Sequence, residues 1–385
     1  MNDKIEKVLL LLLMNSLSKY REQIDKIDKQ IVELILKRSE LASEIGKIKK
    51  ENNLPIYKPE REVKIYENIK KLYHEFYKNK KLENKFPIES LIYIYRELMS
   101  GTIQMEGGIK VGYLGPPGSF SHSAVQQRFG KSIEAIPYNS IRDIFREVEL
   151  GEKIRYGVVP VENTIGGTVG NTLDEIITST LSIYAEIYVK ISQNLLAKKE
   201  IPLEKINRIY TISIAKEQCM NWLSSNLDIK KVEFIETTST AAAAKLVAEK
   251  GDGVAIGSEL SAELYNLKIL YRNIQDTSNN ITRFWVLSNQ SSTEITGNDK
   301  TSIVVGVHDK PGSLYSILEP FYKAKINLTK IESRRTKRIY GEYNFFIDFE
   351  GHQKDSKIEK ILKTIEKRSS FLRVLGSYPQ GIKDL

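Results

Sequence analysis

The sequence predicts a multidomain protein with an all-α segment, a two-lobed α/β segment and a small α+β segment of ferredoxin-like order. The chain has 385 residues, which is more than one hydrophobic core usually supports. Near the N-terminus, apolar residues keep a 3-4 spacing over several heptads, which is typical of a long packed helix. Strand-like and helix-like runs alternate afterwards. We expect the domains to cover residues 1–106, 107–290 and 299–385.

Composition and charge narrow the possible functions. Hydrophobic residues make up 41% and charged residues 28% of the chain, as in a folded globular protein. The net charge of +9 suits nucleic acid or an anionic metabolite. Because neither zinc-finger spacing nor an aromatic-basic platform is present, we expect no nucleic-acid partner. The single cysteine, Cys219, fits a reducing, cytoplasmic location. The four histidines lack metal-ligand spacing, so we expect no metal.

Only one apolar run resembles a membrane segment. It extends from Val8 to Met14 and is far too short to span a bilayer. We interpret it as the first turns of a helix and expect no membrane partner.

The first segment is predicted to begin with a long helix that carries an apolar stripe. The stripe residues are Leu17, Tyr20, Ile24, Ile27, Ile31, Leu34, Leu41, Ile45 and Ile48. Arg38 interrupts the stripe. It either extends its charged head into water at the stripe edge or faces an anion inside a helical bundle. Pro55 and Pro59 end this helix, and further helices are expected from about Glu60 and over Ile88–Glu106.

Two cations on this helix are spaced to face one ligand. Lys49 follows Arg38 by 11 residues, or about three turns, so both side chains point to one side about 16 Å apart. They can hold a small dicarboxylate between them. Arg21 precedes Arg38 by 17 residues, or about 25 Å, so it cannot reach the same ligand from the same helix. If Arg21 contributes, it comes from a partner chain, which predicts an intertwined dimer.

Charged residues at fixed spacing over the three predicted helices resemble the all-helical chorismate mutase family. The matching residues are Arg21, Arg38, Lys49, Arg61, Glu62, Ser100, Gly101, Thr102 and Glu106. The resemblance implies that Arg21, Arg38 and Lys49 bind the carboxylates and ether oxygen of chorismate. It also implies that Arg61 and Glu62 complete the substrate site and that Thr102 stands where the family often has serine.

Two positions depart from this family pattern. Lys58 stands where the family usually has aspartate, so no carboxylate is available there for a substrate hydroxyl. Glu106 stands where many members have glutamine, and a glutamate donates a hydrogen bond to the ether oxygen only when it is protonated. The family reaction is a pericyclic rearrangement to prephenate. It requires a compact bound conformer and stabilisation of negative charge on the ether oxygen, and no cofactor.

The middle segment contains enough alternating elements for two lobes with a cleft between them. Two of its turns, at Glu162–Gly167 and Gly115–His122, are rich in glycine and lead toward helices. Glycine lets backbone N–H groups approach a ligand, and helix N-termini attract anions. Each turn is also compatible with an ordinary strand-to-helix connection. No Gly-Lys-Ser/Thr sequence follows the second turn, so we expect no nucleotide site.

Thr282-Arg283-Phe284 precedes an apolar run and, taken alone, is typical of a strand edge. Combined with the two turns and Gln218-Cys219, it resembles the prephenate dehydratase family. That family removes water and carbon dioxide from prephenate to give phenylpyruvate. The resemblance implies that Thr282 donates a proton or hydrogen bond to the departing hydroxyl and that Arg283 binds a substrate carboxylate. Further expected substrate-binding residues are Ser121, Asn163, Thr164, Thr211, Gln218 and Phe284.

Cysteine and histidine side chains are reactive, but we expect no catalytic role for either here. The dehydratase reaction needs no nucleophile, so we interpret Cys219 as a small buried hydrophobe. Ile212 stands where the family often has histidine, and we therefore assign no histidine a catalytic role. His122 either helps to position substrate or caps its helix.

The last segment reads strand-helix-strand-strand-helix-strand after a polar linker over 291–300. Such a module can serve purely for oligomerisation. Two of its motifs resemble the ACT regulatory domain, which binds phenylalanine between paired subunits. The expected effector-binding residues are Gly312, Ser313, Leu314, Asn327, Leu328, Glu332 and Ser333. Ser313 replaces the usual small apolar residue, and Arg335 replaces the proline usual after the second motif.

The three resemblances follow the order of the bifunctional chorismate mutase/prephenate dehydratase family, whose two reactions are successive steps of phenylalanine synthesis. Chorismate and prephenate are the expected substrates, phenylalanine is the expected effector, and the chain is expected to form a homodimer or homotetramer. Two alternatives remain. The first segment can be a degenerate mutase kept as a dimerisation arm, or the whole chain can be a non-catalytic sensor of anions or amino acids.

Overall fold

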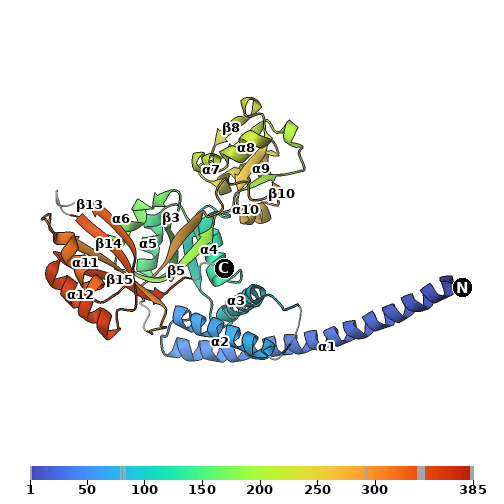
Figure 1. The fold of residues 1–385 in the computed structure, drawn as a ribbon, viewed down its shortest axis with the longest axis horizontal. Coiled ribbons are helices and arrows are strands. Elements are labelled where there is room, and N and C mark those ends of the chain that lie inside the picture. Colours follow the sequence, from blue (N-terminus) through green and yellow to red (C-terminus); the bar gives the residue numbers. More distant parts are fainter. Residues whose placement is uncertain (1, 79, 81–83, 291–293, 336–342, 382–385) are drawn as a thin grey trace.

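The structure is a computed structural model that describes residues 2–78, 80, 84–290, 294–335 and 343–381 (Figure 1). For residues 2–13 and 15 it describes the backbone only. The chain forms three parts, which we call the helical segment, the middle segment and the C-terminal segment. Among the described residues, no helix is both long and apolar enough to cross a membrane.

The helical segment consists of α1 (Asn2–Glu51), α2 (Pro59–Tyr77) and α3 (Ile88–Met105), in agreement with the three expected helices. Pro59 is the first residue of α2, where a helix needs no N–H donor. Much of α1 projects away from the rest of the chain (Figure 1). The predicted apolar stripe is therefore not packed within one chain. Its nine residues are each 47–66% exposed.

The middle segment has two lobes, each built on one sheet. The first-lobe sheet has the order β2-β1-β3-β11-β5, with the short β4 paired to β3. Its strands are β1 (Lys110–Leu114), β2 (Glu134–Tyr138), β3 (Tyr156–Asn163), β4 (Gly167–Thr168), β5 (Ser182–Lys190) and β11 (Ile281–Ser288). Its helices are α4 (Phe120–Phe129), α5 (Ile141–Leu150) and α6 (Gly170–Thr178).

The second-lobe sheet has the order β10-β6-β9-β7-β8. Its strands are β6 (Asn194–Ala197), β7 (Arg208–Thr211), β8 (Glu233–Glu236), β9 (Val254–Gly257) and β10 (Lys268–Tyr271). The helices of this lobe are α7 (Ser213–Gln218), α8 (Met220–Asn226), α9 (Thr240–Lys250) and α10 (Glu259–Leu264), with 3₁₀ turns at Leu203–Lys205 and Ile229–Lys231. The chain crosses between the lobes twice, after β5 and before β11.

Some details of the middle segment differ from the sequence prediction. The run 217–227, whose sequence is typical of one helix, falls in the structure on α7 and α8 with a break at Cys219. The strand β5 was not predicted, because its side chains are buried on both faces and the period-2 alternation is lost.

The C-terminal segment consists of β12 (Asp299–Val307), α11 (Ser313–Lys323), β13 (Leu328–Arg335), β14 (Tyr343–Glu350), α12 (Ser356–Arg368) and β15 (Phe371–Pro379). Its antiparallel sheet has the order β13-β14-β12-β15, which is the ferredoxin-like arrangement predicted from the element order. The expected linker over 291–300 is shorter than predicted, because Asp299 and Lys300 already belong to β12. Residues 291–293 and part of the turn before β14 lie outside the described residues.

The first-lobe sheet is covered on both faces. One face packs against α4 and against Tyr57, which enters this core from the loop between α1 and α2. The other face packs against α5, α6 and residues of the C-terminal sheet. Gly376 on β15 permits this second contact, because a Cβ atom there would lie 2.1 Å from the Ile183 carbonyl oxygen on β5. The middle segment therefore joins the other two parts.

Strand β13 presents alternate side chains to the middle segment. Lys330 forms an ion pair with Glu162, next to the glycine-rich turn after β3. Glu332 accepts a hydrogen bond of 3.0 Å from the Thr168 hydroxyl group. Arg334 lies 2.8 Å from Asp174 on α6 and also donates to the Gly170 carbonyl oxygen. The intervening residues of β13 point to the opposite face of the C-terminal sheet.

A buried ionic cluster joins the first-lobe sheet to the C-terminal sheet. Arg283 on β11 is 2% exposed and lies 2.8 Å from Glu186 and 2.5 Å from Asp348. It also contacts Glu162 at 3.2 Å and donates to the Tyr378 hydroxyl group at 3.1 Å. Burial disfavours the charge on Arg283, but Asp348, Tyr378 and Glu186 outweigh burial and hold its pKa well above the usual value.

This geometry gives Arg283 a structural role that the sequence did not suggest. Its guanidinium group bonds to three carboxylates and to the Tyr378 hydroxyl group, so it holds two sheets together. Arg283 also lines a small cavity with Asn163, and its bond to a substrate carboxylate stays a prediction. Successive side chains on β11 point to opposite faces of the sheet, so Thr282 lies on the other face.

We predict that Arg283→Met destabilises the protein strongly. The substitution removes the cation that pairs with buried Asp348 and one of two cations that bond to buried Glu186, the other being Lys300. Breaking a buried pair typically costs about 3–5 kcal/mol. Urea unfolding followed through the fluorescence of Trp285, which is buried in the same strand, measures the loss. As a control, Arg142→Met removes a pair with Glu175 in which the arginine is 79% exposed, and it should cost less than about 1 kcal/mol. Equal losses for the two variants would contradict the assigned role.

Candidate active sites

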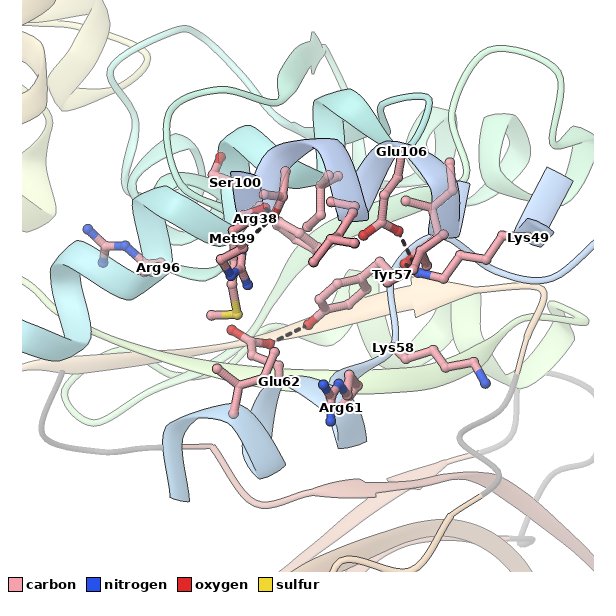
Figure 2. Close-up of a pocket in the computed structure, with 18 of the residues that line it drawn as sticks. Arg38, Lys49, Tyr57, Lys58, Arg61, Glu62, Arg96, Met99, Ser100 and Glu106 are labelled. Atoms are coloured by element: carbon pink, nitrogen blue, oxygen red, sulfur yellow. Dashed lines mark hydrogen bonds and ion pairs between the residues drawn. The ribbon is translucent and has the colours of Figure 1, made fainter. Parts of the chain in front are cut away.

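A cavity of about 500 Å³ opens in the helical segment (Figure 2). It brings together most of the charged residues that the sequence singled out. The cavity is lined by Arg38, Lys49, Lys58, Arg61, Glu62, Thr102 and Glu106, together with apolar residues of α1 and α3. Its volume suits a small-molecule ligand, and its excess of cations favours an anion.

Residues of α1 and α3 form one wall of this cavity. Arg38 and Lys49 lie on the same side of α1, as their spacing predicted. Arg38 donates to the Thr102 hydroxyl group at 3.3 Å, and Lys49 donates to the Ile56 carbonyl oxygen at 2.8 Å. Neither contact uses all the donors of the cation, so both can also bind an anion in the cavity.

Glu106 lies beside Lys49, with its Oε2 atom 2.5 Å from the ammonium nitrogen. Gly46 makes this approach possible, because a Cβ atom at that position would lie 2.5 Å from the Glu106 Cα. In this structure Glu106 accepts a hydrogen bond from Lys49 and so orients the ammonium group. A hydrogen bond from Glu106 to the ether oxygen stays a prediction.

Glu62 on α2 is buried at the opposite side of the cavity. Its Oε1 accepts a hydrogen bond from the Tyr66 hydroxyl group at 3.2 Å, and its Oε2 accepts one from the Tyr57 hydroxyl group at 3.1 Å. Arg128, from α4 of the middle segment, lies 2.9 Å from the same Oε2. Sequence reasoning missed Tyr57 and Arg128, because nothing in the spacing links a residue of α4 to the helical segment.

Arg21 does not reach the cavity of its own chain. It lies on the projecting part of α1 and is exposed. This is the position expected if Arg21 serves a second copy of the chain.

A second candidate site lies where β3 and β11 end side by side. Asn163 donates to the Thr282 hydroxyl oxygen at 2.8 Å and to Asn280 Oδ1 at 2.6 Å. The side-chain carbonyl oxygen of Asn163 accepts hydrogen bonds from the backbone N–H groups of Ile165 and Gly166, and these bonds fix the turn. Because Thr282 accepts from Asn163, its own hydroxyl hydrogen remains available to a ligand.

Asn280 was not among the expected site residues. Its side chain is fully buried, and its Nδ2 atom has no hydrogen-bond partner among the residues that the structure describes. A buried donor without a partner is costly unless a ligand or water satisfies it. Its signal in the sequence was its place two residues before Thr282.

Four other expected residues form no hydrogen bond with Asn163 or Thr282 in the part of the chain that the structure describes. Gln218 belongs to the second lobe and accepts a hydrogen bond of 3.3 Å from Gln193, which lies in the crossing between the lobes. Thr211 is buried at the end of β7 in that lobe. Thr164 anchors the second crossing by bonding to the backbone of Asn279 and Ile281. Ser121 is buried in the first turn of α4.

The structure contradicts the substrate-binding role that was expected for Phe284. Its side chain is 1% exposed and packs in the first-lobe core, so it does not line the cleft.

The structure shows the surroundings of Cys219 and His122. Cys219 is buried in the second-lobe core, and burial raises its pKa to about 12, which confirms its interpretation as a small hydrophobe. His122 accepts a hydrogen bond from Gly118 N–H and stacks on Tyr113. Burial lowers the pKa of His122, so the ring is neutral. The helix cap is Ser119, and His122 donates its N–H to that cap.

A cavity of about 260 Å³ lies on the C-terminal segment between the start of α11 and β13. Ser313, Leu314 and Ser333 line it, and Gly312 is the N-cap of α11 with a φ of 83°. Asn327 and Glu332 are used elsewhere, since Asn327 donates to Glu350 and Glu332 accepts from Thr168. Leu328 pairs with Phe349 inside the sheet. The structure therefore collects only part of the expected effector set.

Among the described residues, no group of three or more histidine, cysteine, aspartate or glutamate side chains is placed so that it could hold a metal ion.

Three family models match the chain in consecutive order. The chorismate mutase type II model matches residues 20–107, the prephenate dehydratase model residues 111–292 and the ACT domain model residues 301–367.

Curated relatives match nearly the whole chain. The bifunctional chorismate mutase/prephenate dehydratase of Aquifex aeolicus is 45% identical over 96% of this chain and 99% of its own length. The protein of the same name from Pseudomonas aeruginosa is 36% identical over the same shares. Among solved structures, the prephenate dehydratase of Arthrobacter aurescens in complex with L-Phe is 33% identical and covers 72% of this chain and 92% of its own, with a TM-score of 0.66.

Identity at this level over nearly full length, with all three family models in the same order, shows the family. The chain belongs to the bifunctional chorismate mutase/prephenate dehydratases.

Proposed function

We propose that this chain rearranges chorismate to prephenate in the helical cavity and converts prephenate to phenylpyruvate at the site around Thr282. The observation that carries the proposal is the convergence of Arg38, Lys49 and Arg61 on one cavity. These residues come from two helices, and packing alone does not require three cations around one cavity of this size. A protein that only binds an anion would also need cations around its ligand. The family to which this chain belongs favours catalysis of the two reactions instead.

In the first reaction the cavity acts through position and charge. Arg38 and Arg61 hold the two carboxylates of chorismate in the compact conformer. Lys49, oriented by Glu106, stabilises the negative charge that develops on the ether oxygen. No proton is transferred and no covalent intermediate forms.

In the second reaction the ring carboxylate leaves as carbon dioxide, its bonding electrons complete the aromatic ring, and the ring hydroxyl departs. The departing oxygen needs a proton or a strong hydrogen bond. Thr282 supplies it, because Asn163 occupies its oxygen and leaves the hydroxyl hydrogen free to point at the substrate. Asn280 offers a further N–H donor in the same place.

We predict that Arg38→Ala and Thr282→Ala separate the two activities. Arg38→Ala should lower mutase kcat/KM about 100- to 1,000-fold and leave prephenate turnover intact, because the cavity loses a charge at its centre. Thr282→Ala should lower dehydratase kcat about 100-fold or more, with Thr282→Ser partly active. The measurement supplies chorismate and then prephenate and follows phenylpyruvate. A wild-type protein that uses only prephenate would instead favour the degenerate-mutase alternative, and one that binds both compounds without product would favour the sensor.

We also propose that the chain functions as a dimer through α1, in the cytoplasm. The nine apolar stripe residues of α1 are about half exposed in one chain, and a continuous apolar stripe of this length is covered in a stable helix pair. Pairing two copies of α1 also offers Arg21 to the cavity of the partner. The single buried cysteine suits a reducing compartment.

This dimer predicts complementation between two inactive variants. In a mixed dimer of Arg21→Ala and Arg38→Ala chains, one cavity receives both intact arginines and the other receives neither. Mixing the variants, with unfolding and refolding to exchange chains, should restore mutase activity at about a quarter of the sites. Mixtures that stay as inactive as their components would show that Arg21 does not act across the dimer. Arg21→Ala mixed with itself is the matched control.

Phenylalanine is the proposed effector of the dehydratase reaction. The cavity between α11 and β13 is large enough for one amino acid, and the related structure from Arthrobacter aurescens contains L-Phe. Strand β13 lines this cavity through Ser333 and contacts the turn beside Asn163 through Lys330. A ligand that shifts β13 therefore acts on the segment that positions Thr282.

We predict that millimolar phenylalanine suppresses phenylpyruvate formation from prephenate. Ser333→Phe fills the cavity and should remove the response. Thr329→Phe places the same side chain on the same strand outside the residues that line the cavity, and it should keep the response. Dehydratase rates with and without phenylalanine measure the effect, and equal responses in the two variants would place the effector elsewhere.

A further inference from the structure

Arg128 belongs to the middle segment, yet its side chain ends inside the cavity of the helical segment. It lies near the end of α4, and its side chain is 13% exposed. Together with Phe129 it contributes to the lining of that cavity. We propose that Arg128 is a positioning residue of the mutase site, through which the dehydratase part of the chain completes the mutase part. This inference rests on the proposed role of the cavity and of Glu62 in it.

The contacts of Arg128 all converge on Glu62. Its Nη2 atom lies 2.9 Å from Glu62 Oε2, and its Nε atom donates to the Tyr57 hydroxyl oxygen at 2.6 Å. Tyr57 in turn donates to Glu62 Oε2 at 3.1 Å. Arg128 therefore holds the carboxylate both directly and through the tyrosine.

This arrangement leaves one side of the carboxylate for a ligand. A carboxylate oxygen accepts about two hydrogen bonds. Oε2 of Glu62 already accepts from Tyr57 and Arg128, whereas Oε1 accepts from Tyr66. Oε1 thus keeps one acceptor position that can take a hydrogen bond from a substrate hydroxyl group. Lys58 cannot offer such an acceptor, since an ammonium group has donors only.

The buried charge of Glu62 also needs a compensating cation. Glu62 is buried, and burying a carboxylate is costly unless a cation and hydrogen bonds accompany it. The two tyrosine hydroxyl groups are neutral, and Arg128 is the cation that bonds directly to Glu62 in the described part of the chain. Without Arg128, the cations of the cavity, Arg61 foremost, would compete for Glu62 and would be drawn away from the substrate.

The loop that carries Tyr57 is fixed by the middle segment as well. The backbone carbonyl oxygen of Tyr57 accepts hydrogen bonds from the Tyr184 hydroxyl group at 3.1 Å and from the Tyr156 hydroxyl group at 3.4 Å. Its ring packs edge-on against Phe129 with the centroids 4.9 Å apart. The position of the Tyr57 hydroxyl group is thus set by three side chains of the first lobe.

The test is a double-mutant cycle on the full-length chain. Arg128→Met should lower mutase kcat/KM about 10- to 100-fold, as expected when a substrate-contacting group loses its position. Glu62→Gln should lower it by at least as much. Because Arg128 acts through Glu62, the double variant should be no slower than Glu62→Gln alone. Arg128→Lys retains a cation and should recover part of the loss.

Two controls separate positioning from general damage. The same preparation of Arg128→Met should convert prephenate to phenylpyruvate at the wild-type rate, which shows that the first lobe is folded. Lys131→Met removes a cation three residues along the chain, whose ammonium group bonds to Glu263 at 2.8 Å, and it should leave mutase activity unchanged.

The possible outcomes are distinct. If Arg128→Met has wild-type mutase activity and Glu62→Gln has reduced mutase activity, the positioning role of Arg128 is overturned while the proposed function stays intact. If the losses of mutase kcat/KM in the two single variants multiply in the double variant, the claim that Arg128 acts through Glu62 is overturned. Full mutase activity in Glu62→Gln would instead contradict the proposed role of Glu62 in the cavity.

Discussion

The middle segment is attached to each of its neighbours by an arginine that is largely or fully buried and is paired with a carboxylate of the neighbouring part. On one face of the first lobe Arg128 meets Glu62 of the helical segment, and on the other Arg283 meets Asp348 of the C-terminal segment. Burying a charge is tolerated only when its partner has the right position, so each pair fixes the orientation of two domains. A hydrophobic contact of the same area would hold the parts together with less directional constraint.

Each of these pairs lies next to a candidate site. Glu62 lines the helical cavity, and Arg283 follows Thr282 directly in β11. The strand period sends the two side chains of β11 to opposite faces of the sheet, so Arg283 holds the C-terminal sheet while Thr282 bonds to Asn163. Glu162 and Asn163 divide their contacts in a similar way, since Glu162 pairs with Lys330 and Asn163 donates to Thr282. Domain attachment and site geometry thus depend on the same two strand ends.

The sequence predicted the elements better than it predicted the contacts between them. Helical periodicity identified α1, and the 11-residue spacing placed Arg38 and Lys49 on one side of a cavity, because both facts depend on one helix alone. The ferredoxin-like order was predicted from the alternation of short strands and helices. Arg128 was missed because its role depends on how α4 packs on another domain, and no local pattern encodes that contact.

The errors have the same origin. Thr282-Arg283-Phe284 was treated as one functional unit, but a strand sends neighbouring side chains to different surroundings. Arg283 and Phe284 are therefore buried on either side of the sheet, in an ionic cluster and in the apolar core. For Glu106 the sequence indicated a hydrogen bond to the ether oxygen that requires a protonated carboxyl group, and it indicated no partner within the chain. Only the close approach of α3 to α1 at Gly46 reveals its partner Lys49.

The long helix α1 links the helical cavity to the proposed pairing of two chains. Its C-terminal turns carry Arg38 and Lys49 into the cavity, whereas the turns around Arg21 extend away from every other part of the chain (Figure 1). A helix of 50 residues is much longer than its own chain can cover, and its stripe stays apolar along the uncovered part. Propensity alone does not explain an apolar stripe on a surface, because helix formation is equally favourable with polar residues there. The stripe is explained if a second α1 covers it, and the same pairing would deliver the arginine that the cavity of one chain lacks.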